Sequence, residues 1–162
     1  MFHYFTSSLA LAYVSWLVGM LVNSWLQKTS YYQKWSNLNF ITSKPVNRYL
    51  GLSGFKWIVK NTFFKYLNQK IKIEGKLEPT TLQTLRKEMT FSEISHLIGF
   101  VFVSFFAVYQ LAKGAFLFAL IITLVNIFMN MYPSLLQQEN KRRIDRLLKV
   151  AERSQLASAG LL

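Results

Sequence analysis

A carboxylate and an imidazole stand three residues apart at the start of one apolar segment. Glu93 and His96 therefore share a helical face, and Glu88 lies about a turn and a half before Glu93. A carboxylate that accepts a hydrogen bond from one imidazole nitrogen fixes the tautomer and leaves the other nitrogen as a general base. The same residues would also anchor the helix at a membrane surface. The spacing thus fits either a catalytic or an anchoring role.

Amide side chains recur at helical intervals in the next apolar segment. This polar stripe, with steps of four, three, four and three residues, comprises Asn126, Asn130, Pro133, Gln137 and Asn140. It leads directly into three cations, which are Lys141, Arg142 and Arg143. Interhelical hydrogen bonds, which commonly join membrane helices, would explain the amides. A polar groove for a lipid head group that enters from the cytoplasmic leaflet would explain them as well.

Residue types exclude or disfavour several other kinds of site. The absence of cysteine excludes disulfides, thiolate catalysis and Cys-zinc sites. One Glu-x-x-His is half of a carboxylate-bridged metal motif, but a di-iron bundle needs a second copy, and His3 is the only other histidine. The sequence also lacks the serine nucleophile elbow, the phosphate-binding glycine loop and the zinc-protease motif. We therefore expect no metal and no cofactor.

Three apolar segments are long enough to hold these residues in a membrane. They cover about residues 9–26, 94–111 and 115–136, and a hydrocarbon core needs roughly 20 helical residues. Hydrophobic residues make up 52% of the chain and charged residues only 16%, which is low for a soluble domain. The break at 112–114, which contains Lys113 and Gly114, predicts a tight helical hairpin. The predicted fold is all-α, with three transmembrane helices in one membrane domain over residues 1–162.

Basic residues cluster in two places and set the expected topology. The formal net charge is +12, and no Asp or Glu precedes Glu74. The loop 27–90 and the tail 141–162 carry most of the cations, so we expect both in the cytoplasm and the N-terminus outside. Such a multi-pass arrangement suits a bacterial-type plasma (inner) membrane. Nucleic-acid binding is disfavoured, because the cations flank apolar spans and no DNA- or RNA-binding motif is present.

The basic loop contains a second kind of pattern. Apolar residues recur with a helical period at Phe55, Ile58, Val59, Phe63, Tyr66 and Leu67. Lys56 and Lys60 occupy other faces, which predicts an amphipathic helix lying at the membrane interface; packing against a soluble core is the alternative. A further helix is expected over Leu82 to Met89, with Thr80 or Thr81 as its N-cap.

The segment from about Thr84 to Leu148 resembles the glycosyl-4,4'-diaponeurosporenoate acyltransferase family of small integral membrane proteins. Members show a Glu-rich segment ending in E-x-x-H, then an N-x-P turn and a Q-R-Y-N-R-P-R-L signature. The corresponding run here is Gln137-Gln138-Glu139-Asn140-Lys141-Arg142-Arg143-Ile144. Pro133 stands one position later than the family's proline. The resemblance implies transfer of a fatty acyl group to a sugar hydroxyl on a membrane-embedded carotenoid glycoside.

The resemblance also implies roles for the residues named above. His96, backed by Glu93 or Glu88, would take the proton of the sugar hydroxyl. The amides that would bind substrate are Asn126, Asn130, Gln137 and Asn140. The last three would also donate hydrogen bonds to the negative charge that develops on the acyl carbonyl. The three cations would hold the phosphate of an acyl donor. The expected partners are membrane lipid, an acyl donor and a glycosylated lipid or carotenoid acceptor.

Two other functions fit the same residues. A non-catalytic membrane subunit would use the polar stripe to dock a partner helix, and the small size of the chain favours this. A lipid-modifying methyltransferase also stays open, since no donor motif is visible. Three spans leave little room for a closed active site. In an enzyme of this kind, part of the site would be formed by lipid, by the loop 27–90 or by a second copy in a homo-oligomer.

Overall fold

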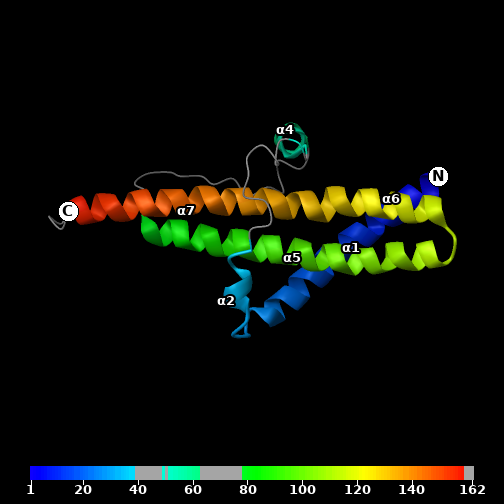
Figure 1. Cartoon of the computed structure of the whole chain (residues 1–162), viewed down its shortest axis with the longest axis horizontal. Coiled ribbons are helices and arrows are strands. Elements are labelled where there is room, and N and C mark those ends of the chain that lie inside the picture. The colour runs from blue at the N-terminus through cyan, green and yellow to red at the C-terminus, as the bar shows by residue number, and fades with distance from the viewer. Residues whose placement is uncertain (39–48, 50, 63–77, 159–162) are drawn as a thin grey trace. The chain divides into compact units, whose positions relative to one another are not determined.

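The computed structural model describes residues 1–38, 49, 51–62 and 78–158. Every regular element in these ranges is helical, which confirms the all-α prediction (Figure 1). The elements are α1 (Phe2–Leu26), α2 (Tyr32–Trp35), α4 (Leu52–Asn61), α5 (Pro79–Ala112), α6 (Phe116–Asn126), the π-helical turn η2 (Ile127–Met131) and α7 (Tyr132–Ser158). The chain divides into two compact parts, unit 1 (residues 1–38 and 91–135) and unit 2 (residues 39–90 and 136–162).

Three helices are long and apolar enough to cross a membrane, as predicted. They are Phe2–Leu26, Pro79–Ala112 and the helical stretch Phe116–Ala157. Each extends beyond the apolar segment recognised in the sequence. At about 1.5 Å per residue, the 34 residues of α5 reach about 50 Å, which exceeds a hydrocarbon core of about 30 Å. The charged first turns of α5 therefore extend out of the apolar layer.

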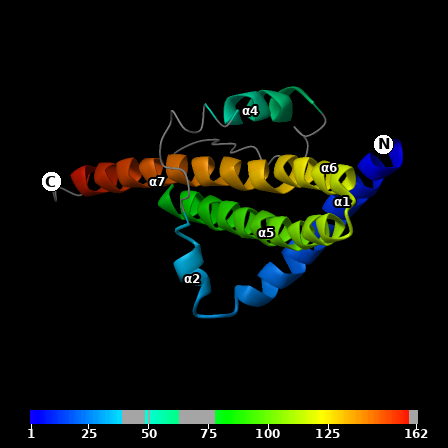
Figure 2. The ribbon, with the colours of Figure 1, turned by 45° about the vertical axis from the view of Figure 1, so that its right-hand side comes forward.

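In unit 1, α1 runs obliquely across α6 and contacts it (Figure 2). The buried face of α1 is built of small and polar residues, namely Ser8, Ala12, Ser15, Gly19 and Asn23. Its large residues, such as Leu17 and Leu21, point outward. Val103, Ala107 and Ile122 form an apolar core between α5 and α6. An exposed apolar surface around a small-residue contact face is typical of helices that pack in lipid.

The predicted hairpin between the second and third spans is confirmed. Helix α5 ends at Ala112 and α6 begins at Phe116. Gly114 has φ +75°, a left-handed conformation that glycine adopts without a steric penalty. Its N–H donates to the carbonyl of Leu111 at 2.9 Å, which satisfies one of the carbonyls at the end of α5.

In unit 2, the first turns of α5 pack against α7. Leu82 and Met89 of α5 share a core cluster with Ile144 and Ala151 of α7. Helix α5 begins at Pro79, so Thr80 and Thr81, the expected N-cap residues, lie inside its first turn. Proline is favoured in the first turn because it has no N–H to leave unpaired and its φ is already helical.

The amphipathic helix predicted in the basic loop is present as α4. Its apolar face is buried through Leu52, Phe55 and Val59, while Lys60 is exposed. Phe63, Tyr66 and Leu67 of the same prediction lie outside the described residues. The protein covers this face, as the soluble-core alternative required, and contact of α4 with the membrane interface stays a prediction.

Candidate functional site

A hydrogen-bonded polar cluster lies between the helices of unit 1, with Asn130 of η2 at its centre. Asn130 is fully buried, and its Nδ2 donates to Ser15 Oγ of α1 at 3.1 Å and to Asn126 Oδ1 at 2.9 Å. Ser15 Oγ in turn donates to the Ala12 carbonyl at 2.7 Å. Both hydrogens of the Asn130 amide therefore have acceptors inside the protein, and its Oδ1 remains as an acceptor.

Asn126 links the third span to the second. Its Nδ2 donates to the carbonyl of Phe100 at 3.0 Å and to Ser104 Oγ at 3.2 Å, both on α5. These are interhelical hydrogen bonds of the kind that join membrane helices. Asn126 thus acts as a structural link between α6 and α5.

His96 lies beside Asn130 and Trp16. The Asn130 side chain is within hydrogen-bonding reach of the imidazole. Trp16 of α1 meets the ring edge-on, with 6.0 Å between ring centroids. The Nδ1 atom of His96 is buried and has no hydrogen-bond partner among the described residues. A buried polar atom without a partner is rare and is often found at sites that bind or react.

The π-helical turn η2 shapes this site. Residues Ile127–Met131 form i→i+5 bonds, so the third span is not one uniform α-helix. Trp16 Nε1 donates to the Met129 carbonyl at 3.3 Å, within this turn. Single π-turns of this type are frequent at functional sites. The turn therefore presents both Asn130 and a backbone acceptor to α1.

The two carboxylates predicted to assist His96 differ in environment. Glu93 is fully buried in unit 1, three residues before His96 on α5. Glu88 is exposed and belongs to unit 2. Burial thus singles out Glu93, and not Glu88, as the carboxylate of the apolar unit.

Close contacts hold α1 against α5 around the site. A Cβ at Gly19 would lie 2.2 Å from the Ser95 carbonyl oxygen, and one at Gly99 would lie 2.9 Å from Asn130 Oδ1. Asn23 Nδ2 donates to the Phe91 carbonyl at 2.8 Å and to Ser95 Oγ at 2.9 Å. The two backbones approach closely because glycine presents no side chain there.

The other predicted site residues lie in unit 2. Asn140 Nδ2 donates to Gln137 Oε1 at 3.4 Å. Of the three cations, Lys141 is buried, Arg142 is half-buried and Arg143 is exposed. The same helix, α7, also carries Glu139 and Asp145, which form ion pairs.

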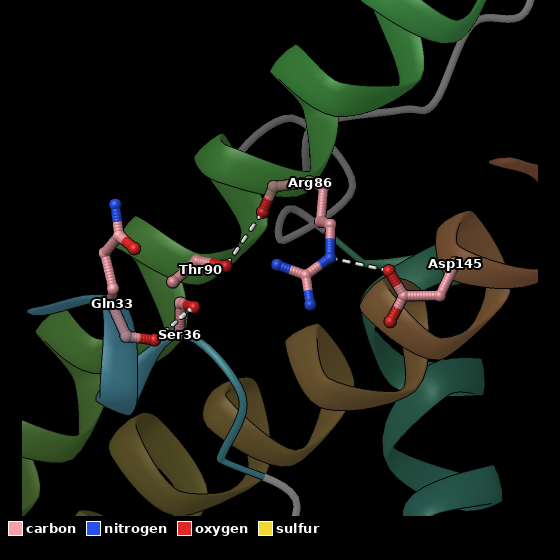
Figure 3. A network of polar contacts seen from close by, with 5 residues as sticks. All are labelled: Gln33, Ser36, Arg86, Thr90 and Asp145. Atoms are coloured by element: carbon pink, nitrogen blue, oxygen red, sulfur yellow. Dashed lines mark hydrogen bonds and ion pairs between the residues drawn. The ribbon is translucent and has the colours of Figure 1, made fainter.

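Two ion pairs join the elements of unit 2. Lys56 of α4 pairs with Glu139 of α7. Arg86 Nε of α5 lies 2.6 Å from Asp145 Oδ1 of α7, and Figure 3 shows the two side chains reaching toward each other. All four side chains keep some solvent exposure. Neither ion pair was predicted from the sequence, because partners such as Arg86 and Asp145, which are 59 positions apart, leave no local pattern.

Several residues of the unit 1 site were not predicted. They are Ser15, Trp16, Asn23, Ser95 and Ser134. Ser134 is fully buried one turn after Asn130, and its hydroxyl has no hydrogen-bond partner among the described residues. The steps of three and four residues among the small and polar residues of α1 are the signal that would have found Ser15 and Asn23. Within the described ranges, no group of three or more His, Asp or Glu side chains is placed to hold a metal ion.

A comparison with protein families gives a match over most of the chain. The family model for glycosyl-4,4'-diaponeurosporenoate acyltransferase matches residues 22–150, which is most of the chain and includes the unit 1 site from Asn23 to Asn130. No curated protein and no solved structure matches the chain.

Proposed function

The chain belongs to the glycosyl-4,4'-diaponeurosporenoate acyltransferase family, and on this premise we propose that it esterifies a sugar hydroxyl of a carotenoid glycoside with His96 as the general base. It is thus a multi-pass membrane protein and an acyltransferase of carotenoid glycoside modification. Beyond this, we propose the sugar hydroxyl as the acceptor, His96 as the base and the roles of the residues around it.

The proposed reaction moves one acyl group and one proton. The sugar oxygen attacks the carbonyl carbon of an activated acyl donor, and the bond from that carbon to the leaving group breaks as the new ester bond forms. His96 accepts the hydroxyl proton and then returns it to the leaving group. A sugar hydroxyl is a weak nucleophile without such a base, which contributes about 10²–10⁴-fold in rate.

The observation that carries the proposal is the environment of His96. Its ring is held between Trp16 and Asn130 in the apolar unit, and Nδ1 is buried without a partner among the described residues. Leaving a buried polar atom unpaired costs about 1–3 kcal/mol, a cost that a structural histidine has no reason to carry. Glu93, one turn earlier and fully buried, is the carboxylate that would support the imidazolium.

Charge that develops on the acyl carbonyl needs a hydrogen-bond donor. The amide hydrogens of Asn126 and Asn130 are already donated within the chain, so these residues do not suit that role. We assign it to the buried hydroxyl of Ser134. The residues of unit 2 form no part of this assignment. For Gln137 and Asn140 substrate binding stays a prediction, as does phosphate binding for Lys141, Arg142 and Arg143.

The same hydrogen bonds bear on the alternative of a non-catalytic subunit. A stripe that docks a partner helix needs unused donors, but Asn126 and Asn130 bind helices of this chain. The structure therefore offers no observation that favours partner docking over catalysis at these two residues.

The test is to extract pigment from cells that make the glycosylated carotenoid and express this chain, and to measure the acylated product by mass. His96→Ala should lower the ester by at least about 100-fold, because it removes the base. His3→Ala is the matched control, since His3 is the other histidine and is exposed; it should leave the ester at the wild-type amount. Membrane insertion and thermal unfolding in detergent are measured for both. A folded His96→Ala protein with full activity would contradict the proposal.

A further inference from the structure

We propose that Asn130 is a positioning residue, which accepts a hydrogen bond from the His96 ring through Oδ1 and so selects the imidazole tautomer. The inference rests on His96 being the base of the proposed function. The hydrogens of two amides and two hydroxyls can be assigned by starting from backbone carbonyls, which can only accept.

The first atom that fixes the direction of a hydrogen bond is the carbonyl oxygen of Phe100. It accepts from Asn126 at 3.0 Å, so the atom facing it must be the Asn126 nitrogen. The other hydrogen of that nitrogen goes to Ser104 Oγ, whose own hydroxyl hydrogen goes to the Phe100 carbonyl at 2.7 Å. Asn126 Oδ1 is consequently an acceptor on the opposite side, where Asn130 meets it at 2.9 Å. The nitrogen of Asn130 must face Asn126.

The second such atom is the carbonyl oxygen of Ala12. Ser15 Oγ lies 2.7 Å from it and 3.5 Å from Asn130 Oδ1, so the shorter bond takes the hydroxyl hydrogen. Ser15 Oγ then accepts from Asn130 Nδ2 at 3.1 Å. The two hydrogens of the Asn130 amide are thereby used, one toward Asn126 and one toward Ser15.

The remaining atom, Asn130 Oδ1, faces the helix that carries His96. A Cβ at Gly99 would lie 2.9 Å from Oδ1. Gly99 is three residues after His96 on α5, so the two positions share a helical face. Since Asn130 has no hydrogen left to give, its contact with His96 requires the ring to donate and Oδ1 to accept.

This arrangement has a chemical consequence for the base. Neutral imidazole carries one N–H, and directing it to Oδ1 leaves the other ring nitrogen with a free lone pair. A carboxylate in the same place would orient the ring but would add a charge inside an apolar layer. An amide acceptor orients the ring without that charge, and Asn126 and Ser15 hold the amide in the required orientation.

The experiment uses the two histidines of the chain. In the His3→Ala protein, ¹⁵N-labelled His96 is the only imidazole, so ¹⁵N NMR in detergent or lipid reads its tautomer directly. We expect one tautomer in His3→Ala and a mixture in His3→Ala/Asn130→Leu. Asn130→Asp, which keeps an acceptor oxygen, should retain one tautomer and at least ten times the kcat of Asn130→Leu. A single unchanged tautomer in folded Asn130→Leu, or equal kcat for the Asp and Leu variants, would overturn the inference.

A second variant covers the case in which Asn130→Leu does not fold. Ser15→Ala removes one acceptor of the Asn130 amide, so the amide group is no longer held in one orientation. We expect a measurable second tautomer and a several-fold lower kcat with KM unchanged; an unchanged spectrum would contradict the inference. Because the spectrum needs no substrate, an Asn130-dependent tautomer in a protein without transferase activity would refute the proposed function alone.

Discussion

Polar side chains join helices in both units, but their chemistry differs. In unit 1 the links are neutral: Asn126 binds a backbone carbonyl and a hydroxyl, and Asn130 binds Ser15 and Asn126. In unit 2 the links include the ion pairs Lys56–Glu139 and Arg86–Asp145. The apolar core of unit 2 is formed by Leu82, Met89, Ile144 and Ala151.

The physical reason is the solvent around each set of helices. Within a hydrocarbon layer, a charge costs several kcal/mol, whereas an amide can be satisfied by a neighbouring helix at little cost. Partly exposed ion pairs tolerate water and contribute about 0.2–1 kcal/mol each. Neutral hydrogen bonds and close backbone contacts thus fix the geometry of unit 1, whereas ion pairs contribute little to that of unit 2.

Gly19→Ala should have the largest effect. The new Cβ would meet the Ser95 carbonyl oxygen at 2.2 Å, so α1 must move away from α5. We expect at least about 3 kcal/mol lower stability, the upper end for overpacking, measured by unfolding in mixed detergent micelles. Gly54→Ala in α4 is the matched control, because no atom lies within 4 Å of its Cβ; it should be neutral or stabilise by about 0.5 kcal/mol. Equal effects would show that the α1–α5 contact is not a constraint.

Asn126→Leu should have an intermediate effect. It keeps the branching at Cγ but removes the bonds to Phe100, Ser104 and Asn130. Interhelical hydrogen bonds in membranes contribute about 0.6 kcal/mol each on average, so a loss of about 1–2 kcal/mol is expected. The loss should not depend on salt, since no charge is involved. Thr123→Val, one turn earlier and exposed, bonds only its own helix and should change stability little. Wild-type stability of Asn126→Leu would contradict the structural link.

The Arg86–Asp145 pair should have the smallest effect. A double-mutant cycle with Arg86→Gln and Asp145→Asn should give a coupling free energy of about 0.2–1 kcal/mol, because both side chains are partly exposed. Raising the salt concentration should reduce this coupling, in contrast to Asn126→Leu. A coupling that persists in high salt would place the pair in a drier environment than its exposure indicates.

Much of the fold could be read from local composition. The apolar segments, the hairpin at Gly114 and the helix around Phe55 all depend on residues near one another in the chain. The start of α5 was misplaced because Pro79 was read as lying before the helix, whereas its missing N–H suits the first turn. The packing of Leu52, Phe55 and Val59 against protein was not predictable, because an apolar helical face has the same pattern whether protein or lipid covers it.

The candidate site was predictable in part. Glu93, His96 and Asn130 stood out because polar groups are expensive in an apolar span. Ser15 and Trp16 did not, since serine is tolerated in membrane helices and tryptophan counts as one more apolar residue of the span. The helical period grouped Asn126 with Asn130 correctly, but the π-helical turn that follows Asn126 has no recognisable sequence pattern.

Hydropathy and charge are properties of consecutive residues, so the order of residues alone was enough to predict which helices are long and apolar enough to cross a membrane. The direction of each hydrogen bond depends instead on which helices face one another: Ser15 and Asn130 are 115 positions apart. From the sequence alone, Asn130 could either donate to a substrate or accept from His96. In the folded chain, the carbonyls of Ala12 and Phe100 lie beside Ser15 and Asn126 and so fix the direction of the hydrogen bonds of Asn130. Those two acceptors, brought in by folding, make Asn130 Oδ1 the atom that faces the imidazole.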